Sequence, residues 1–329
     1  MIVTTDRQSA FDRLLAAVPF KGAVLNQTSA WWMARTAHIV PNALLVRGPL
    51  IDLCGCLLAM CRSNLQVRAL SRLLLLTSSS SSVLRPPTLP PQSVPDPAAC
   101  VMRKCEVFPV EFVVRGFMTG STETSLWTHY AAGEREYCGV RFPDGMAKNA
   151  RLAANVITPT TKAETHDEPI APADIVGRGL MSAADWEAAS AAALKLFAFG
   201  QAEAARRGLL LVDTKYEFGR DPATGAVTLV DEIHTPDSSR YWLAASYAAR
   251  HAAGAEPESV DKEFLRLWFR AHCDPYADAE LPAAPKELVA ELARRYILLY
   301  ETITGEAFAP PEGAPPPGER IRAAVLAAL

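Results

Sequence analysis

One stretch of the chain constrains its fold and its chemistry more than any other. Residues 209–219 read LLLVDTKYEFG, and from residue 212 onward charged side chains alternate with mainly apolar ones. Because successive side chains of a strand point to opposite faces, this period predicts a strand over residues 209–218. One predicted face carries Val212, Thr214, Tyr216 and Phe218, and the other carries Asp213, Lys215 and Glu217. The first face suits a core, and the second predicts a polar site.

The residues that follow predict a hairpin. Residues 221–225 read DPATG, which is typical of a turn, and residues 226–232 would form the returning strand. The hairpin would bring Asp231, which precedes Glu232, close to the acidic row of the first strand. A few carboxylates with open positions left for phosphate and water suit Mg²⁺, and a neighbouring lysine suits a phosphate oxygen. The two strands therefore predict phosphate chemistry rather than a binding module.

The bulk composition excludes several classes of function. The chain has 329 residues, 50% of them hydrophobic, which is enough for one large domain or two small ones. Its net charge of −3 gives no general electrostatic case for nucleic acid or an anionic membrane, and no uncharged apolar run reaches the ~18 residues of a membrane span. The seven cysteines are irregularly spaced and match no zinc pattern. Free thiols in a reducing compartment are therefore expected.

The order of the expected elements indicates an α+β fold with a cleft between two lobes. Strands are expected at residues 2–5 and 108–115, and a loop at residues 6–12. One helix is expected at residues 26–35, a second begins at the capping box SAAD of residues 182–185 and ends near Gly208, and a third spans residues 285–304. The chain after residue 308 is rich in Pro and Gly and is expected to fray, with a short helix at residues 321–329 as the alternative.

Four further segments gather polar groups, and each has a plain structural alternative. Residues 115–122 read RGFMTGST and suit a phosphate cradle, or they end a strand with a solvated arginine. Residues 158–164 place Lys162 in a hydroxyl-rich turn that could hold a nucleotide phosphate, or lie on the surface. Residues 234–242 place Asp237 and Arg240 where they could grip a polar substrate, or they begin a helix. Residues 6–12, with Lys21 beyond them, form a polar loop or an ordinary turn.

Taken together, these segments resemble one family, the phosphoribosylaminoimidazole-succinocarboxamide synthases, also called SAICAR synthetases. Two signatures are matched by VFPVEFVVRGFMTGS at residues 107–121 and by LVDTKYEFG at residues 211–219. Shorter matches in the family's order are DRxSAFD at residues 6–12, TPTTK at 158–162, DE at 231–232, TPDSSR at 235–240 and DKEFLR at 261–266. The resemblance covers residues 2–47 and about 100–308.

The resemblance implies an ATP-dependent C–N ligase of de novo purine synthesis, with an ATP cleft between antiparallel sheets and flanking helices. Members join L-aspartate to the carboxylate of carboxyaminoimidazole ribonucleotide, giving SAICAR, and convert ATP to ADP and phosphate with Mg²⁺. A carboxylate is a poor electrophile, and phosphorylation turns it into an acyl phosphate that an amine can attack. Such transfer depends on positioning and charge neutralisation rather than on a protein nucleophile. The chain accordingly shows no Ser-His-Asp or Cys-His signature.

The resemblance also assigns roles to residues of this chain. Glu217 and Asp231 resemble the Mg²⁺ ligands, and Lys162 resembles the lysine of the nucleotide site. Lys215 and Asp213 resemble catalytic residues that contact ATP and the imidazole, and Glu217 is also oriented towards the ATP phosphates.

The remaining assignments concern the other substrates. A clamp on the ribonucleotide 5′-phosphate is expected from Arg115, Ser121 and Arg240. Asp237 is expected to hold the imidazole amine, and Asp12 and Lys21 to lie in a loop near the substrate cleft.

The chain differs from the family pattern in two places, and these differences set the expected domain boundaries. The family begins with a strand pair that carries lysines over the ATP phosphates, so residues 1–47 are expected to form only part of the N-terminal ATP lobe. Residues 48–99 replace a short connection with a Ser-, Pro- and Leu-rich segment, either an inserted loop or an unspliced intron, which is expected to be disordered. Protection of this segment from limited proteolysis would contradict that expectation. Residues 100–308 are expected to complete the synthetase domain, and residues 309–329 to form a tail.

Other interpretations remain open at this point. A chain without the family's N-terminal lysines could be a non-catalytic remnant that still binds the ribonucleotide, or the substrate could be a related phosphate-bearing carboxylate. Small molecules are the expected partners, with no nucleic acid and no membrane, and a homo-oligomer is left open. Plant members are plastid-associated, so the expected compartment is the cytoplasm or the plastid stroma.

Overall fold

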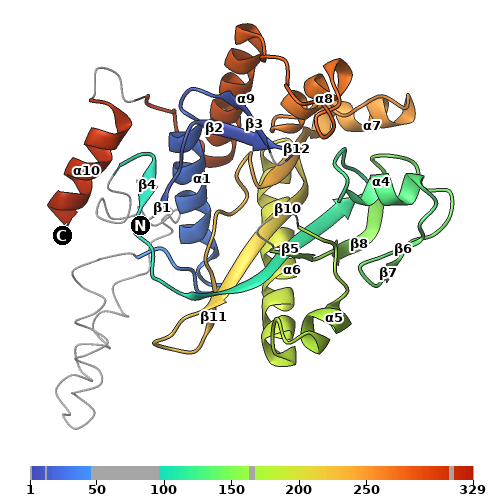
Figure 1. Ribbon diagram of the computed structural model, residues 1–329, viewed down its shortest axis with the longest axis horizontal. Helices are drawn as coiled ribbons and strands as arrows, with labels where there is room; N and C mark the ends of the chain where they lie inside the picture. Colours follow the sequence, from blue (N-terminus) through green and yellow to red (C-terminus); the bar gives the residue numbers. More distant parts are fainter. Residues whose placement is uncertain (1, 12, 46–95, 163–166, 311–314, 329) are drawn as a thin grey trace, which may run out of the picture.

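The computed structural model describes residues 2–11, 13–45, 96–162, 167–310 and 315–328, and within them a six-stranded antiparallel sheet forms the centre of the molecule (Figure 1). Two long strands, β5 (Glu106–Phe117) and β10 (Leu209–Arg220), pair along most of their length. The other four strands extend this pair. β8 (Arg151–Ile157) and β9 (Thr160–Thr161) pair with β5, whereas β11 (Val227–Leu229) and β12 (Ser239–Leu243) pair with β10.

Smaller strand pairs lie outside this sheet. They are β1 (Ile2–Val3) with β4 (Ala99–Cys100), β2 (Arg7–Ala10) with β3 (Arg13–Ala17), and β6 (Glu136–Tyr137) with β7 (Val140–Arg141). The loop expected at residues 6–12 was therefore wrong. The inward positions of β2 are Gln8 and Ala10, so a polar residue concealed the alternation that identifies a strand.

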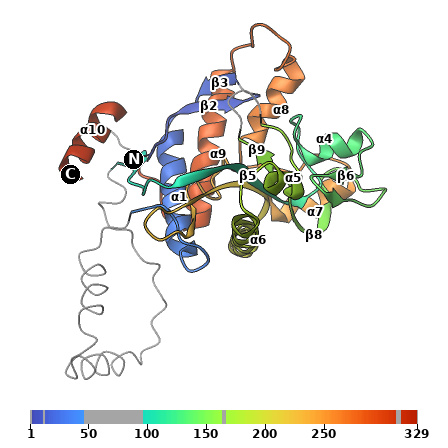
Figure 2. The same ribbon diagram turned by 60° about the horizontal axis from the view of Figure 1, so that its bottom comes forward.

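One long helix covers one face of the sheet, and other helices pack around the sheet. α6 (Ala183–Arg206) lies along one face of the sheet, with β2, β3 and α8 (Glu263–His272) towards the other side (Figure 2). α1 (Lys21–Thr36) packs beside α9 (Lys286–Thr304). The shorter helices are α4 (Leu126–Ala131), α5 (Pro172–Gly177), α7 (Ala244–Ala252) and α10 (Pro317–Ala328).

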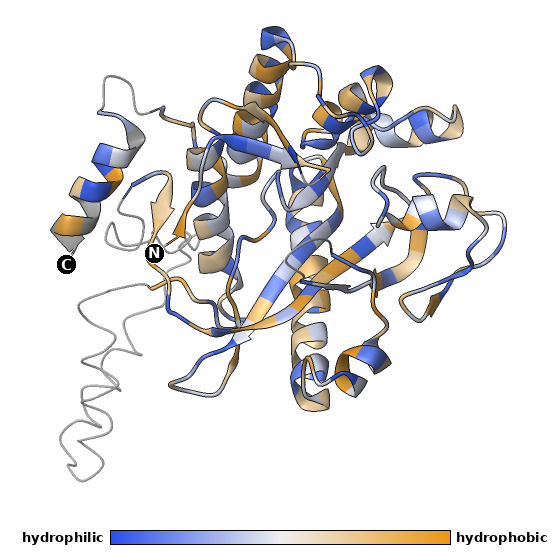
Figure 3. Ribbon diagram, in the orientation of Figure 1, coloured by the Kyte–Doolittle hydropathy of each residue, from blue (hydrophilic) through white to orange (hydrophobic). Residues whose placement is uncertain are grey.

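The core follows from the apolar faces of these elements. Phe112 of β5 and Tyr216 and Phe218 of β10 pack against α6, which confirms the predicted inner face of β10 over that part. Val212 departs from the prediction, because the strand register shifts between Leu211 and Asp213 and Val212 packs in a separate cluster with Phe117 and Trp242. A second large cluster joins β2, α1, α8 and α9. Figure 3 shows hydrophobic and hydrophilic residues interleaved along α9.

The three expected helices are confirmed, together with the signals that end them. The Ser182 Oγ atom accepts a hydrogen bond from the Asp185 backbone N–H at 3.1 Å, so the capping box starts α6. Gly305 follows α9 with φ of 75°, the left-handed conformation that glycine adopts without strain. Near the C-terminus, α10 forms from Pro317. The frayed tail was therefore wrong over residues 317–328, and the alternative of a short helix is confirmed over residues 321–328.

Several expectations fall on residues that the structure does not describe. Asp12 is among these, as are residues 48–95 of the proposed insertion with Cys54, Cys56 and Cys61, for which no role is expected. The expected disorder is wrong for residues 96–99, because Ala98 and Ala99 are buried and Ala99 pairs with Val3 of β1. The α+β class with antiparallel sheets and flanking helices is confirmed, and the division into two lobes stays a prediction. No helix in the described ranges is both long and apolar enough to cross a membrane.

Candidate active site

Three neighbouring strands bring the charged residues of the site together. Asp213 of β10 lies opposite Arg115 of β5 on one side and opposite Arg240 of β12 on the other. Further along β10, Glu217 lies opposite Glu111 of β5. The antiparallel register therefore places residues from distant parts of the chain on one face of the sheet.

Lys215 lies between two carboxylates on this face. Its Nζ atom is 3.3 Å from Oε1 of Glu217 and also pairs with Glu111. Lys162, which follows β9, pairs with Oε2 of Glu217. Both carboxylates are 8% exposed, whereas the Lys162 side chain is 45% exposed. The row of charges thus runs from a buried centre to a lysine that reaches solvent.

Burial favours the neutral form of each side chain in this row, and neighbouring charges determine whether each pKa rises or falls. Burial disfavours the charged form of Lys215, but Glu111 and Glu217 outweigh it and raise the pKa of Lys215 above its usual range. Burial likewise favours the neutral form of Glu217, but Lys215 and Lys162 lower the pKa of Glu217. Burial prevails at Glu111 and raises its pKa. Lys215 and Glu217 are therefore both charged at neutral pH.

Asp231 lies close enough to Glu217 for the two carboxylates to repel one another. Burial first and Glu217 second raise the pKa of Asp231, as expected for a carboxylate buried beside another carboxylate. In the described ranges no three His, Cys, Asp or Glu side chains converge as a metal site. Two carboxylates nevertheless fit Mg²⁺, which often takes one or two protein ligands and fills its other positions with phosphate and water.

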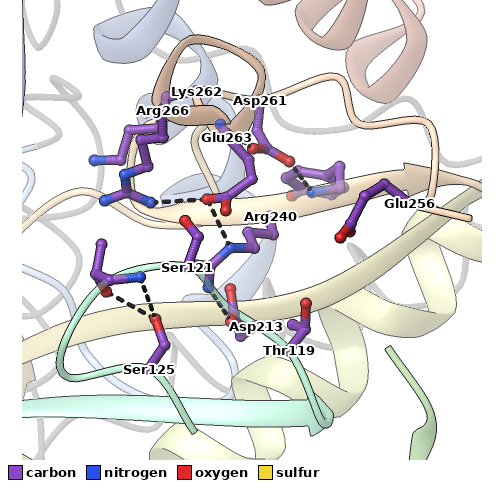
Figure 4. Close-up of polar contacts among 12 residues, drawn as sticks. Thr119, Ser121, Ser125, Asp213, Arg240, Glu256, Asp261, Lys262, Glu263 and Arg266 are labelled. Atoms are coloured by element: carbon purple, nitrogen blue, oxygen red, sulfur yellow. Dashed lines mark hydrogen bonds and ion pairs between the residues drawn. The ribbon is translucent and has the colours of Figure 1, made fainter. Parts of the chain in front are cut away.

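Beyond Lys215, two arginines converge on a single carboxylate. Oδ2 of Asp213 is 3.6 Å from Nη1 of Arg115 and 2.5 Å from Nη1 of Arg240. Nε of Arg240 is also 3.3 Å from Oε2 of Glu263. Figure 4 shows Arg240 between these two carboxylates, with Ser121 beside it. Paired guanidinium groups next to a hydroxyl suit the oxygens of a phosphate group.

The two guanidinium groups respond differently to burial. Burial lowers the pKa of Arg240, but Asp213 and Glu263 outweigh it and raise this pKa above its usual range. The Arg115 side chain is 5% exposed, and burial outweighs Asp213 there, so the pKa of Arg115 is lowered. The charge of Arg115 is thus incompletely compensated within the protein. An anion bound beside it would supply the missing negative charge.

Asp237 lies between two ammonium groups at the other side of the site. Its Oδ2 atom is 3.3 Å from Nζ of Lys21, and its Oδ1 atom is 3.2 Å from Nζ of Lys262. Burial would raise the pKa of Asp237, but Lys262 and Lys21 hold it well below its usual range. An ionised carboxylate here can accept a hydrogen bond from a ligand N–H. The alternative that Asp237 begins a helix is wrong, because the strand β12 starts at Ser239.

Two cavities connect these groups. One, of about 280 Å³, is lined by residues that include Arg115, Asp213, Lys215, Asp237 and Arg240. The other, of about 160 Å³, is lined by residues that include Lys21, Asp231, Glu232 and Asp237. Asp237 lines both cavities, so they meet at its carboxylate. Glu217 and Lys162 line neither cavity and join the site through their contacts with Lys215 and each other.

The structure thus brings together most of the residues that the sequence singled out. Arg115 is 4% exposed, so the alternative of a solvated arginine is wrong. Lys162 is half exposed, in agreement with the surface-turn alternative, yet it also contacts Glu217. Ser121 is placed beside Arg240 and Glu263 (Figure 4). Asp12 lies outside the described residues, so its assignment stays a prediction.

Several residues of the site carried no role in the sequence analysis. Glu111 lies two positions from Val113 and four from Arg115 in β5, so strand alternation from Arg115 could have identified it. Lys262 and Glu263 belong to the DKEFLR segment but reach Asp237 and Arg240 only through the tertiary fold. Local pattern therefore gave no reason to place them in the site.

Comparison with known proteins supplies the family of this fold and site. The family model described as SAICAR synthetase matches residues 1–282. A phosphoribosylaminoimidazole-succinocarboxamide synthase of Legionella pneumophila (strain Paris) is 52% identical over 98% of this chain and 88% of its own length. The chloroplastic synthase of Arabidopsis thaliana is also 52% identical, over 93% of this chain and 62% of its own length.

Solved structures agree with these relatives. A SAICAR synthase from Saccharomyces cerevisiae complexed with SAICAR has a TM-score of 0.67 and 28% identity, covering 94% of this chain and 89% of its own. A SAICAR synthetase from Pyrococcus horikoshii has a TM-score of 0.58 at 20% identity, over 93% of each chain, and shows the same fold. With the family model covering most of its length, the chain belongs to the SAICAR synthetase family.

Proposed function

We propose that this chain ligates L-aspartate to the carboxylate of carboxyaminoimidazole ribonucleotide, with conversion of ATP to ADP and phosphate, in de novo purine biosynthesis. One observation carries the proposal: a single strand, β10, joins a buried arginine clamp at Asp213 to a row of lysines and carboxylates at Glu217. The names of the relatives with 52% identity support the same reaction. The yeast structure that contains SAICAR supports the product.

The ribonucleotide occupies the larger cavity in this proposal. Arg115 and Arg240, which both line this cavity, bind its 5′-phosphate, and Ser121 beside Arg240 donates a hydroxyl hydrogen bond. Asp237 accepts a hydrogen bond from the imidazole amine. Asp213 orients both guanidinium groups, since each lies within ion-pair distance of its Oδ2 atom. Lys21, at the start of α1 and not in the expected loop, holds Asp237 from the neighbouring cavity. Asp12 is proposed to lie near the substrate.

ATP lies along the row of lysines and carboxylates. Lys162 reaches solvent at the end of the row, where it can meet an incoming phosphate, and Lys215 offers a second positive charge beside Glu217. Glu217 and Asp231 are the proposed ligands of Mg²⁺, which would neutralise phosphate charge when bound. Lys215 lines the same cavity as Asp213, so it can stabilise negative charge that develops on the carboxylate during phosphoryl transfer.

The proposal is tested by ADP release from this chain with ATP, Mg²⁺, the ribonucleotide and aspartate, each omitted in turn. Turnover that requires every component is the expected result. A folded chain that binds the ribonucleotide without turnover would support a non-catalytic remnant. Turnover with another carboxylate or amine in place of the ribonucleotide or aspartate would identify a different substrate.

The domain boundaries and the compartment belong to the same proposal. Residues 1–47 form part of the ATP lobe, residues 48–99 interrupt the domain, residues 100–308 complete it, and residues 309–329 follow it. The cytoplasm or the plastid stroma suits the reaction, and the Arabidopsis relative is named chloroplastic. Imaging of a fluorescent fusion to the complete gene product distinguishes the two compartments.

A further inference from the structure

A buried glutamine contacts the carboxylate where the two cavities meet. Gln8 of β2 is 1% exposed, and its Nε2 atom donates a hydrogen bond to Oδ1 of Asp237 at 3.0 Å. On its other side, Oε1 of Gln8 accepts a hydrogen bond from the Tyr296 hydroxyl at 3.0 Å. Tyr296 belongs to α9 and is fully buried. A strand near the N-terminus and a helix near the C-terminus thus meet at Asp237.

Asp237 and Tyr296 together determine which way the glutamine amide points. An amide has a donor end and an acceptor end, and only one orientation suits a given pair of neighbours. Burial raises the pKa of Tyr296 well above its usual range, so its hydroxyl keeps the proton that it donates. Because the ionised Asp237 carboxylate can only accept, Nε2 of Gln8 faces Asp237, and Oε1 is left to accept from Tyr296.

The two oxygens of Asp237 consequently differ in what they can still accept. Oδ1 accepts from Nε2 of Gln8 at 3.0 Å and pairs with Nζ of Lys262 at 3.2 Å, whereas the single proton of the Tyr296 hydroxyl is donated to Gln8. Oδ2 faces Lys21 at 3.3 Å. Because each carboxylate oxygen has about two lone-pair positions, Oδ1 is saturated, whereas Oδ2 retains room for a ligand donor.

We propose that Gln8 and Tyr296 are positioning residues that fix the plane of the Asp237 carboxylate and present its Oδ2 atom to the imidazole amine of the ribonucleotide. The inference rests on the proposed function, since it needs Asp237 to bind that amine. It extends the site to Gln8 of β2 and Tyr296 of α9, for which the sequence predicted no role in binding. Gln8 and Tyr296 act through Asp237 and touch no substrate themselves.

The test compares Gln8→Leu and Tyr296→Phe with the unaltered chain in two measurements. Calorimetry gives the Kd of the ribonucleotide, and steady-state kinetics gives the KM of each substrate. Gln8→Leu should raise the ribonucleotide Kd and KM about tenfold, and Tyr296→Phe about threefold, because a hydrogen bond to a charged group is lost or misdirected. The KM for ATP should stay within about twofold, since that site keeps its own contacts.

Matched controls remove similar groups elsewhere in the same part of the molecule. Tyr300→Phe removes a hydroxyl one turn further along α9, where it donates to Oε2 of Glu306 at 3.3 Å. Gln27→Leu removes an amide of α1 that donates to the Ala23 carbonyl at 3.3 Å. Both controls should bind the ribonucleotide as the unaltered chain does.

The outcomes separate this inference from the proposed function. If the unaltered chain does not bind the ribonucleotide, the proposed function fails and this inference fails with it. If the unaltered chain binds it and neither Gln8→Leu nor Tyr296→Phe weakens binding, the inference alone is overturned. An equal loss of ribonucleotide and ATP affinity would also overturn it, because that result indicates general damage. Should Gln8→Leu fail to fold, Tyr296→Phe decides, since it removes one oxygen atom.

Discussion

At the scale of single residues, one arginine of the site contacts two carboxylates at once. Arg240 contacts both Asp213 and Glu263, which only a forked guanidinium can do from a fixed backbone position. Arg240→Lys keeps the charge but loses one of these contacts, and we expect the ribonucleotide KM to rise about tenfold with a smaller change in kcat. Arg294→Lys, in an exposed ion pair with Glu291, is the control. An unchanged KM in Arg240→Lys would argue against the phosphate clamp.

A second residue-scale prediction concerns the carboxylate beside Lys215. Glu217→Gln has the same shape but lacks the negative charge proposed to bind Mg²⁺, so we expect kcat to fall at least about 100-fold. The ribonucleotide Kd should change little, because Glu217 lines neither cavity. Turnover across a Mg²⁺ titration and calorimetry with the ribonucleotide give the two quantities. Glu187→Gln on the exposed side of α6 is the control, and wild-type turnover in Glu217→Gln would remove the metal role.

At the scale of elements, close packing fixes α6 against the turn that leads to Asp237. A Cβ atom at Gly200 would lie 2.3 Å from Cε1 of His234 and 2.8 Å from Cδ2 of Leu211. Overpacking costs about 1–3 kcal/mol and the gain in helix propensity offsets about 1 kcal/mol, so Gly200→Ala should lower the free energy of unfolding by up to about 2 kcal/mol. Urea unfolding measures the change. Gly177→Ala in α5, where nothing lies within 4 Å of the new atom, should be neutral or stabilising.

The elements that the sequence predicted are those whose pattern is local. The helices α6 and α9 were predicted from apolar residues at helical spacing, with Ser182 before α6 and Gly305 after α9. The strand β10 was predicted from its alternating side chains. β2 and β12 were missed for a physical reason. Their strand character comes from pairing with β3 and β10, and their residues, such as Gln8 and Ser239, resemble those of loops and caps. Site residues on strands such as β2 and β12 could be identified only from the three-dimensional structure.

At the scale of the whole molecule, one buried histidine joins four elements beneath the site. The His234 ring packs edge-on against Trp32 of α1 and fills the space above Gly200 of α6. It pairs with the Tyr216 hydroxyl of β10, and its carbonyl accepts a hydrogen bond from Tyr241 of β12 at 2.8 Å. Burial lowers the pKa of His234 to about 3. The folded chain therefore keeps this ring neutral where an unfolded chain would protonate it.

This difference makes the stability of the molecule depend on pH. Below the ordinary histidine pKa of about 6.5, His234 binds a proton in the unfolded state but not in the folded state. The free energy of unfolding therefore decreases as the pH falls from 6.5 towards 3. Between pH 7.5 and 5, the unaltered chain should lose about 2 kcal/mol more than His234→Gln does. Urea unfolding at both pH values measures this difference. Equal losses in the two chains would contradict the prediction.

The regular register between β5 and β10 from Asp213 to Glu217 has a geometric consequence. From Asp213 to Glu217 the pairing with β5 has no bulge, so β10 holds the arginine clamp and the row of lysines and carboxylates roughly 13–14 Å apart. The distance that a substrate must span is thus set by backbone geometry that side-chain substitutions leave intact. Adding or deleting one residue between Asp213 and Glu217 would change this distance by about 3.4 Å and turn one of the two side chains to the opposite face of the sheet.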